Sequence, residues 1–294
     1  MAKYYLTDKQ LEKIVKESLI EILKEGIKIN RDKRTVTFDD SDDGIQDGPV
    51  VDTINIPNGK IPVTVYSMFK RVNNVLGDAN PALHGLKGEY GWNFTNKEDF
   101  WNRFDELLTG FFAKHSTDVI VVLPSNHSVN MEIAEHIRKV SPNTKIITDV
   151  IGKLTTLEVF RMADKEGSYF QQYWKKKGES LDVAFKRLNY YLDLMDKKHN
   201  GYFSYHDIDD IQMRQSLINT MEALPESYTL YNNEINDKNV LLLDDSITFG
   251  QSVGSAVNAL ELCYLPKSIS LLTMFSRLYK DNARKKPTTR TKKN

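Results

Sequence analysis

Two adjacent carboxylates, Asp244 and Asp245, stand where an apolar run gives way to a short polar loop. Residues 240–243 before them are apolar, and the loop after them is rich in Ser, Thr and Gly. Ligands of open α/β sheets bind beyond the carboxyl ends of strands, and a helix N-terminus offers free N–H groups to phosphate. Carboxylates at such a site repel phosphate unless they hold hydroxyl groups or Mg²⁺. The pattern therefore favours a sugar phosphate that carries a diol and a metal ion.

A second polar segment follows another apolar run. Residues 118–123 (DVIVVL) have the continuous apolar pattern of a strand buried in a parallel sheet. Ser125, Asn126 and His127 come after Pro124, at the expected carboxyl end of this strand. Residues 129–140 then have the apolar spacing of a helix, so the segment predicts a strand, a polar loop and a helix.

The chain from residue 98 to residue 276 alternates between helix and strand patterns. Besides the segments above, helical spacing occurs over residues 98–114 and 251–262, and strand patterns occur over residues 145–148, 239–243 and 268–274. A mostly helical insert over residues 151–226 interrupts the alternation. Strands separated by helices predict a doubly wound parallel α/β sheet.

The first 97 residues have another pattern. Residues 7–26 predict an amphipathic helix that opens on a T-x-x-Q capping box. Strand patterns over residues 34–38, 51–56 and 63–66 follow, the last two around a turn at 57–59. Residues 77–94 are rich in turn residues and predict a long loop anchored by aromatic side chains. The chain thus divides into an N-terminal helix, small β module and loop (1–97), an α/β domain (98–276) and a tail (277–294).

Composition indicates an ordinary globular protein. The 294 residues include 40 basic and 40 acidic ones, and 40% of the chain is hydrophobic. The one cysteine, Cys263, excludes a disulfide framework. No apolar run reaches the length of a membrane helix and no secretory signal is recognisable, so we expect no membrane partner and a cytoplasmic location.

The zero net charge is an average over unlike parts. Residues 277–294 contain eight basic residues and one acidic residue, so this tail carries a charge of +7. Such a tail predicts either contact with nucleic acid or another polyanion, or a solubilising extension.

The other residues that could do chemistry show no recognisable spacing. The six histidines form neither an H-E-x-x-H motif nor a paired pattern, so the sequence predicts no zinc site, and only His127 is placed to meet an anion. No G-x-S-x-G elbow or Walker P-loop occurs.

The residues around Asp244 resemble the signature of the type I phosphoribosyltransferases, which use 5-phosphoribosyl-1-pyrophosphate (PRPP). That signature has four apolar residues, two acids, two variable residues and T-T-G-x-T/S, and this chain has VLLL-DD-SI-T-F-G-Q-S over residues 240–252. Phe249 stands where the family usually has a second Thr. The resemblance covers roughly residues 115–275 and implies the doubly wound sheet of that family.

The resemblance also implies a role for each matching residue. Asp244 and Asp245 would hold the ribose hydroxyls and, indirectly, Mg²⁺. The 5′-phosphate would be surrounded by Thr248, Phe249, Gly250, Gln251 and Ser252. The pyrophosphate loop would consist of Ser125, Asn126 and His127.

Two further positions refine the resemblance. The N-x-E-I-A run at residues 130–134 is similar to the N-Q-A-E-x-A of the competence-associated, ComF-like branch. Thr248 stands where purine-salvage members place an acid that handles the base, which disfavours purine salvage.

Three functions follow as hypotheses. The first is an enzyme that uses PRPP and Mg²⁺ to transfer phosphoribose to a nitrogen nucleophile, and it could act as a homo-oligomer. The second is a non-catalytic regulator that binds PRPP or a nucleotide, which Phe249 and the lack of Arg or Lys at residues 125–127 would allow. The third is a phage virion or assembly protein in the host cytoplasm, since residues 6–26 resemble N-terminal helices of gut-phage proteins.

Overall fold

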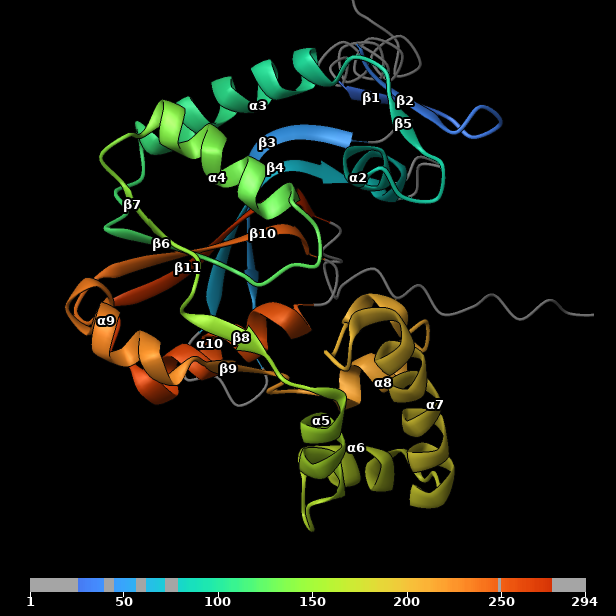
Figure 1. The fold of residues 1–294 in the computed structure, drawn as a ribbon. Coiled ribbons are helices and arrows are strands. Elements are labelled where there is room, and N and C mark those ends of the chain that lie inside the picture. The colour runs from blue at the N-terminus through green and yellow to red at the C-terminus, as the bar shows by residue number, and fades with distance from the viewer. Residues whose placement is uncertain (1–25, 40–44, 57–61, 72–78, 248–249, 277–294) are drawn as a thin grey trace, which may run out of the picture.

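The computed structural model describes residues 26–39, 45–56, 62–71, 79–247 and 250–276 (Figure 1). Several sequence predictions fall outside them: the helix over residues 7–26 except Gly26, the turn at 57–59, the basic tail, and Thr248 and Phe249. Within the described residues, the chain folds around a mostly parallel sheet with helices on both faces (Figure 1).

The central sheet contains six strands in the described part of the chain, in the order β3-β4-β11-β10-β6-β7. Their bounds are β3 (Ile45–Ile54), β4 (Val63–Arg71), β6 (Val119–Val122), β7 (Lys145–Ile147), β10 (Asn239–Ile247) and β11 (Ser268–Ser276). Neighbouring strands are parallel, except that edge strand β3 runs antiparallel to β4. The prediction of an α/β fold is confirmed.

Alternating strand residues pack into two hydrophobic cores on opposite faces of this sheet. One face is covered by α3 (Lys97–Phe112) and α4 (Val129–Val140), and the other by α9 (Pro225–Ile235) and α10 (Gln251–Cys263). Ile120 and Val122 of β6 face the first core, whereas Val119 and Val121 face the second. Because both faces are covered, β6 is buried at every residue, which explains its continuous apolar sequence.

The N-terminal strands β3 and β4 are not part of a separate module. β4 pairs in parallel with β11, and β3 pairs with β4, so this hairpin completes the central sheet. The boundary expected at residue 97 therefore divides residues that share one sheet and its cores. A second sheet contains β1 (Gly26–Asn30), β2 (Thr35–Asp39) and β5 (Asn93–Phe94).

The loop predicted over residues 77–94 contains a helix, α2 (Ala79–Lys87). Its only proline, Pro81, lies in the first turn, where a missing backbone N–H costs little. Gly88 follows the helix with a φ of 68°, the left-handed conformation that commonly ends helices. Ala82, Leu83 and Leu86 are buried against the core that also contains α3. Glycines and a proline thus mark the ends of this helix rather than a loop.

Residues 151–226 are mostly helical and have a hydrophobic core of their own. The segment begins and ends in the antiparallel strands β8 (Ile151–Lys153) and β9 (Met221–Ala223). Between them lie α5 (Thr156–Asp164), α6 (Tyr169–Lys177), α7 (Leu181–His199), the 3₁₀-helix η1 (Tyr205–Asp207) and α8 (Ile211–Ser216). These helices pack around Trp174, Leu188 and Met195, and Figure 1 shows them standing beside the central sheet.

Candidate functional site

A cavity of about 680 Å³ lies at the carboxyl ends of β6 and β10. From β6 the chain continues to its neighbour β7, toward one edge of the sheet, whereas from β10 it continues to its neighbour β11, toward the opposite edge. The strand order therefore reverses between β6 and β10. Open α/β sheets bind ligands at such a reversal. The backbone N–H of Leu123 donates to the carbonyl oxygen of Leu243 at 2.9 Å, so both chain segments leave the sheet side by side.

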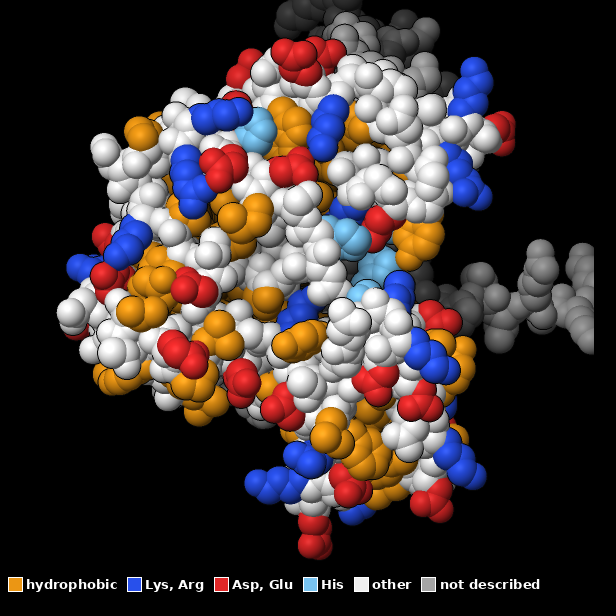
Figure 2. All heavy atoms as spheres, in the orientation of Figure 1, with side chains coloured by type: hydrophobic (Ala, Val, Ile, Leu, Met, Phe, Trp, Pro, Cys, Tyr) orange, Lys and Arg blue, Asp and Glu red, His pale blue; other side chains and the backbone are white. Residues whose placement is uncertain are grey.

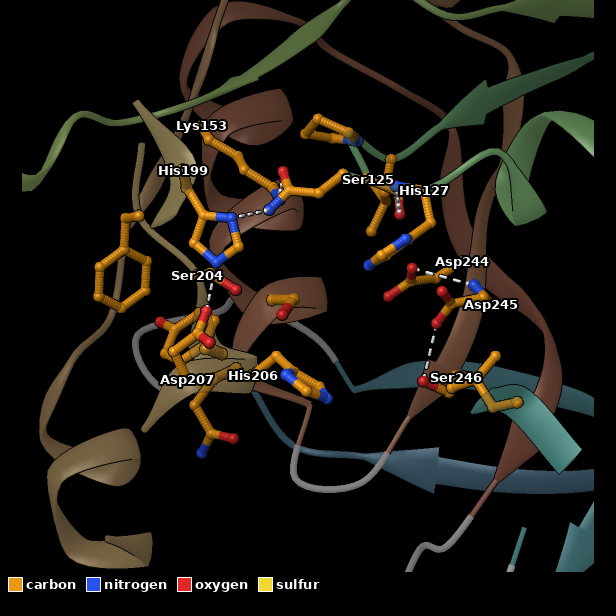
Figure 3. A pocket seen from close by; sticks show the side chains of 18 of the residues that line it. Ser125, His127, Lys153, His199, Ser204, His206, Asp207, Asp244, Asp245 and Ser246 are labelled. Carbon is orange, nitrogen blue, oxygen red and sulfur yellow. Dashed lines mark hydrogen bonds and ion pairs between the residues drawn. The ribbon is translucent and has the colours of Figure 1, made fainter. Parts of the chain in front are cut away.

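The structure brings the two predicted loops together in this cavity. Its lining includes Ser125, Asn126, His127, Asp244, Asp245, Gly250, Gln251 and Ser252. The insert closes the opposite side, and in Figure 3 Lys153, His199 and Asp207 lie across the cavity from Asp244 and Asp245.

Asp244 lines the cavity and is half-buried. Strand β10 continues to Ile247, so the acid pair lies within the strand rather than after it. The side-chain amide of Asn130 donates to Asp244 Oδ1 at 3.3 Å, and the backbone N–H of Asp245 donates to the same oxygen at 3.0 Å. Burial, followed by the charge of Asp245, raises the pKa of Asp244 to about 7. Asp244 therefore changes its charge near neutral pH.

Asp245 has a different environment, because a lysine from α2 reaches it. Lys87 Nζ lies 2.7 Å from Asp245 Oδ2, and each side chain is 9% exposed. The hydroxyl of Ser246 donates to the other carboxylate oxygen at 2.8 Å. A buried ion pair needs such further hydrogen bonds to offset the loss of hydration. Lys87 thus fixes Asp245 and brings a positive charge into the cavity.

The N-terminus of α10 forms another part of the cavity wall. Gly250 caps this helix with a φ of 76°, a conformation that non-glycine residues rarely adopt. A Cβ atom at Gly250 would also lie 3.2 Å from Ile54 Cδ1. Glycine is therefore required here on two counts. Gln251 and Ser252 follow in the first turn, where backbone N–H groups are free for an anion.

The loop after β6 is held by residues of the insert. Lys153 Nζ donates to Asn126 Oδ1 at 2.9 Å, and the Asn126 amide lies 3.0 Å from His199 Nδ1. Burial lowers the pKa of Lys153, while the charges of Asp244 and Asp245 act to raise it. A cation with this position supplies the positive charge that the sequence of residues 125–127 lacks.

A group of histidines surrounds Glu89 at the same cavity. Glu89 accepts from His84 Nδ1 at 2.8 Å and lies 2.7 Å from His127 Nε2. His206, from η1, lies close to His84, with ring centroids 6.1 Å apart. Burial lowers the pKa of both His127 and His206, so both imidazoles are neutral at neutral pH.

Sequence reasoning missed most of the charged groups that line the cavity. The missed residues are Lys87, Glu89, Lys153, Lys198 and Asp207, together with His84, His199 and His206. None of them belongs to a motif, and most come from α2 and the insert, so no local spacing could have found them. Among the charged lining residues, four basic side chains balance four acidic ones.

Comparison with known proteins adds no relative. The chain matches no protein-family model, and no curated protein matches it. In the described part of the chain, none of the helices has the length and apolar character required to cross a membrane. The fold and site define an α/β protein with a polar cavity at the strand-order reversal of its sheet.

Proposed function

We propose that this cavity binds PRPP with Mg²⁺ and that the protein transfers phosphoribose to a nitrogen nucleophile. One observation carries the proposal. Two segments that are far apart in the sequence meet at one cavity where the strand order of the sheet reverses: residues 125–127, and residues 244–247 with 250–252. The acids and the N-terminus of α10 are then close enough to bind the diol and the phosphate of one sugar phosphate.

The described residues suit this ligand in three places. Asp244 and Asp245 offer carboxylate oxygens to the ribose hydroxyls. Gly250 and the first turn of α10 offer backbone N–H groups to the 5′-phosphate, next to the positions of Thr248 and Phe249. Ser125, Asn126 and the Lys153 ammonium offer donors to pyrophosphate.

The donor set also fits Mg²⁺. This ion prefers oxygen ligands and commonly binds through one or two carboxylates together with substrate phosphates. Asp244 is the better placed carboxylate, because Lys87 already occupies one oxygen of Asp245. Asn130 Oδ1, next to Asp244, is buried without a hydrogen-bond partner among the described residues and could accept from water on the ion. Bound there, Mg²⁺ would supply positive charge to the leaving pyrophosphate.

The proposed reaction needs positioning and charge stabilisation more than an acid or base. The bond between ribose C1 and the pyrophosphate oxygen breaks, pyrophosphate leaves with the electron pair, and the acceptor nitrogen bonds to C1. Positive charge develops on the ribosyl group and negative charge on pyrophosphate. The acid pair faces the first charge, and Lys153 and Asn126 face the second.

A non-catalytic PRPP- or nucleotide-binding protein is the second candidate function. The Lys87–Asp245 ion pair favours it, because Lys87 must share or release Asp245 before a ribose hydroxyl can bind there. Turnover then depends on whether Lys87 moves to the phosphates of the ligand.

Calorimetric titration of PRPP with and without Mg²⁺ tests the binding. We expect the wild type to bind only with Mg²⁺, and Asp244→Asn/Asp245→Asn to lose binding at least about a hundredfold, since two charged contacts disappear. Asp182→Asn/Asp193→Asn is the matched control, because it makes the same charge change at exposed positions of α7. Pyrophosphate release with a panel of bases and amines then separates enzyme from regulator. No PRPP binding by the wild type would exclude both functions, and equal binding by the wild type and the Asp244/Asp245 variant would show that the acid pair is not the binding site.

A further inference from the structure

Three histidines and one glutamate converge at the wall of the cavity formed by α2, the loop after β6 and the insert. His84 comes from α2, Glu89 follows that helix, His127 follows β6, and His206 lies in η1. Figure 2 shows histidine side chains gathered at the hollow between the insert and the rest of the molecule. These residues have no metal-binding spacing along the chain, so their proximity is a result of the fold.

The potential ligand atoms are close to one another. The ring nitrogens of His84 and His206 and a carboxylate oxygen of Glu89 all lie within 4.8 Å of one another. His127 Nε2 is also near, at 2.7 Å from Glu89 Oε1. Ligands of a tetrahedral zinc ion, bound at about 2.0–2.1 Å, lie about 3.3 Å apart. The ligand atoms of His84, Glu89 and His206 thus lie near the spacing of ligands around one ion, and His127 adjoins them through Glu89.

The hydrogen bonds of the cluster occupy Glu89 but not His206. Glu89 uses one carboxylate oxygen for His84 Nδ1 and the other for His127 Nε2. His206 makes ring contacts with His84 and Tyr90 but no hydrogen bond among the described residues. A divalent ion can replace the His–Glu hydrogen bonds and gives His206 a partner.

The donor types select the class of ion. Imidazole nitrogens suit Zn²⁺, Co²⁺ and Ni²⁺, whereas Mg²⁺ prefers oxygen ligands only. The cluster shares no residue with the acid pair. It is therefore chemically distinct from the Mg²⁺ site considered above.

We propose that His84, Glu89, His127 and His206 bind one divalent transition-metal ion of the Zn²⁺ class. The ion connects the insert, through His206, to α2 and to the loop after β6. It therefore fixes the insert against the sheet at the cavity. This role does not depend on the proposed phosphoribosyl transfer.

Metal titration of the full-length protein, first stripped with a chelator, tests the site. We expect one equivalent of Co²⁺ to give the visible absorption of imidazole-bound, tetrahedral cobalt, and Zn²⁺ to displace it. Zn²⁺ should raise the melting temperature, because an ion that binds only the folded state stabilises it. Mg²⁺ should do neither.

Variants identify the ligands. Glu89→Gln and His206→Gln should each weaken Zn²⁺ binding at least about tenfold. His206 is exposed, so its substitution is not expected to disturb folding even if that of Glu89 does. His199→Gln is the matched control: this histidine lines the same cavity but is engaged by Asn126 and Asp207.

Two results would overturn the site: His206→Gln binding Zn²⁺ as tightly as the wild type, or His199→Gln losing binding as much as His206→Gln. Asp244→Asn/Asp245→Asn should keep the cobalt spectrum, because the acid pair supplies no ligand. Loss of the spectrum in that variant would place the ion at the acid pair and contradict the proposal. Failure of PRPP to bind would leave these outcomes unchanged.

Discussion

The two adjacent acids of the cavity have neighbours of opposite kinds. Asp245 pairs with the Lys87 ammonium, whereas Asp244 receives hydrogen bonds from the neutral Asn130 amide and a backbone N–H. Burial disfavours the charge of Asp244, and the neighbouring carboxylate of Asp245 adds to that effect. One acid is thus paired with a cation, and the other holds or releases a proton near neutral pH.

The raised pKa of Asp244 predicts how stability depends on pH. Between its ordinary pKa of 3.8 and its folded value of about 7, the folded chain holds a proton that the unfolded chain has released. The contribution of Asp244 to the free energy of unfolding therefore falls as pH rises through this window, by a few kcal/mol at most. Asp244→Asn, which cannot ionise, lacks this fall. Urea unfolding from pH 4 to pH 8 should show that the free energy of unfolding of the variant rises relative to that of the wild type as pH rises. If both free energies change with pH in the same way, the raised pKa of Asp244 is contradicted.

The sequence could predict only those cavity residues that belong to a local pattern along the chain. Asp244, Asp245, Gly250 and the loop at 125–127 follow apolar runs in the sequence, and the structure brings these residues to one cavity. Lys87 and His206 lie outside any such pattern. Their place in the cavity depends on how α2 and the insert pack, which spacing along the chain does not encode.

At the scale of elements, helix α2 contacts both the hydrophobic core and the cavity. Its apolar side chains Ala82, Leu83 and Leu86 are buried in the core beside α3, and its last residue, Lys87, reaches Asp245. The turn-rich composition of residues 77–94 predicted a loop because glycine and proline are poor helix formers. Burial of the apolar face outweighs that preference, as it commonly does in proteins.

The ion pair between α2 and β10 should contribute much more to stability than a surface pair. Removing one partner of a buried pair leaves the other charge uncompensated, so we expect Lys87→Met to lower the free energy of unfolding by about 3–5 kcal/mol. Lys97→Met is the control: it removes the same charge from a pair with Glu132 that is much more exposed to solvent, and it should cost about 0–1 kcal/mol.

Urea denaturation of both variants measures this difference. The double variant Lys87→Met/Asp245→Asn should recover part of the loss, because it no longer leaves an unpaired charge. Equal effects of the Lys87 and Lys97 substitutions would show that the Lys87 pair behaves as a solvated one.

At the scale of the whole molecule, the described chain has two cores that share one sheet and a third inside the insert. Local patterns predicted the strand and helix order from residue 98 onward because each element carries its own periodicity. They could not predict that β4 pairs with β11, since pairing between distant strands leaves no local mark. The hairpin therefore belongs to the sheet although its sequence resembles a separate module.

The separate core of the insert predicts that it can unfold without the sheet. Trp174 is fully buried there, and Arg187 stacks on its ring at 4.6 Å from the centroid. Trp174→Ala should lower the free energy of unfolding of the insert by about 3–5 kcal/mol. This loss should be enough to unfold a small helical unit locally. Hydrogen exchange should then show lost protection in α5 to α8 while β6, β10 and α4 stay protected.

The matched substitution lies in the core beneath α3. Phe104 is also fully buried, and Phe104→Ala should reduce protection in β6 and β10 together with α3 and α4, because those elements share one core.

In the Trp174 variant, the cavity should lose Lys153 and His199 as partners of Asn126, so Zn²⁺ and PRPP binding should both weaken. Simultaneous loss of protection in the insert and the sheet would show that the two unfold as one cooperative unit.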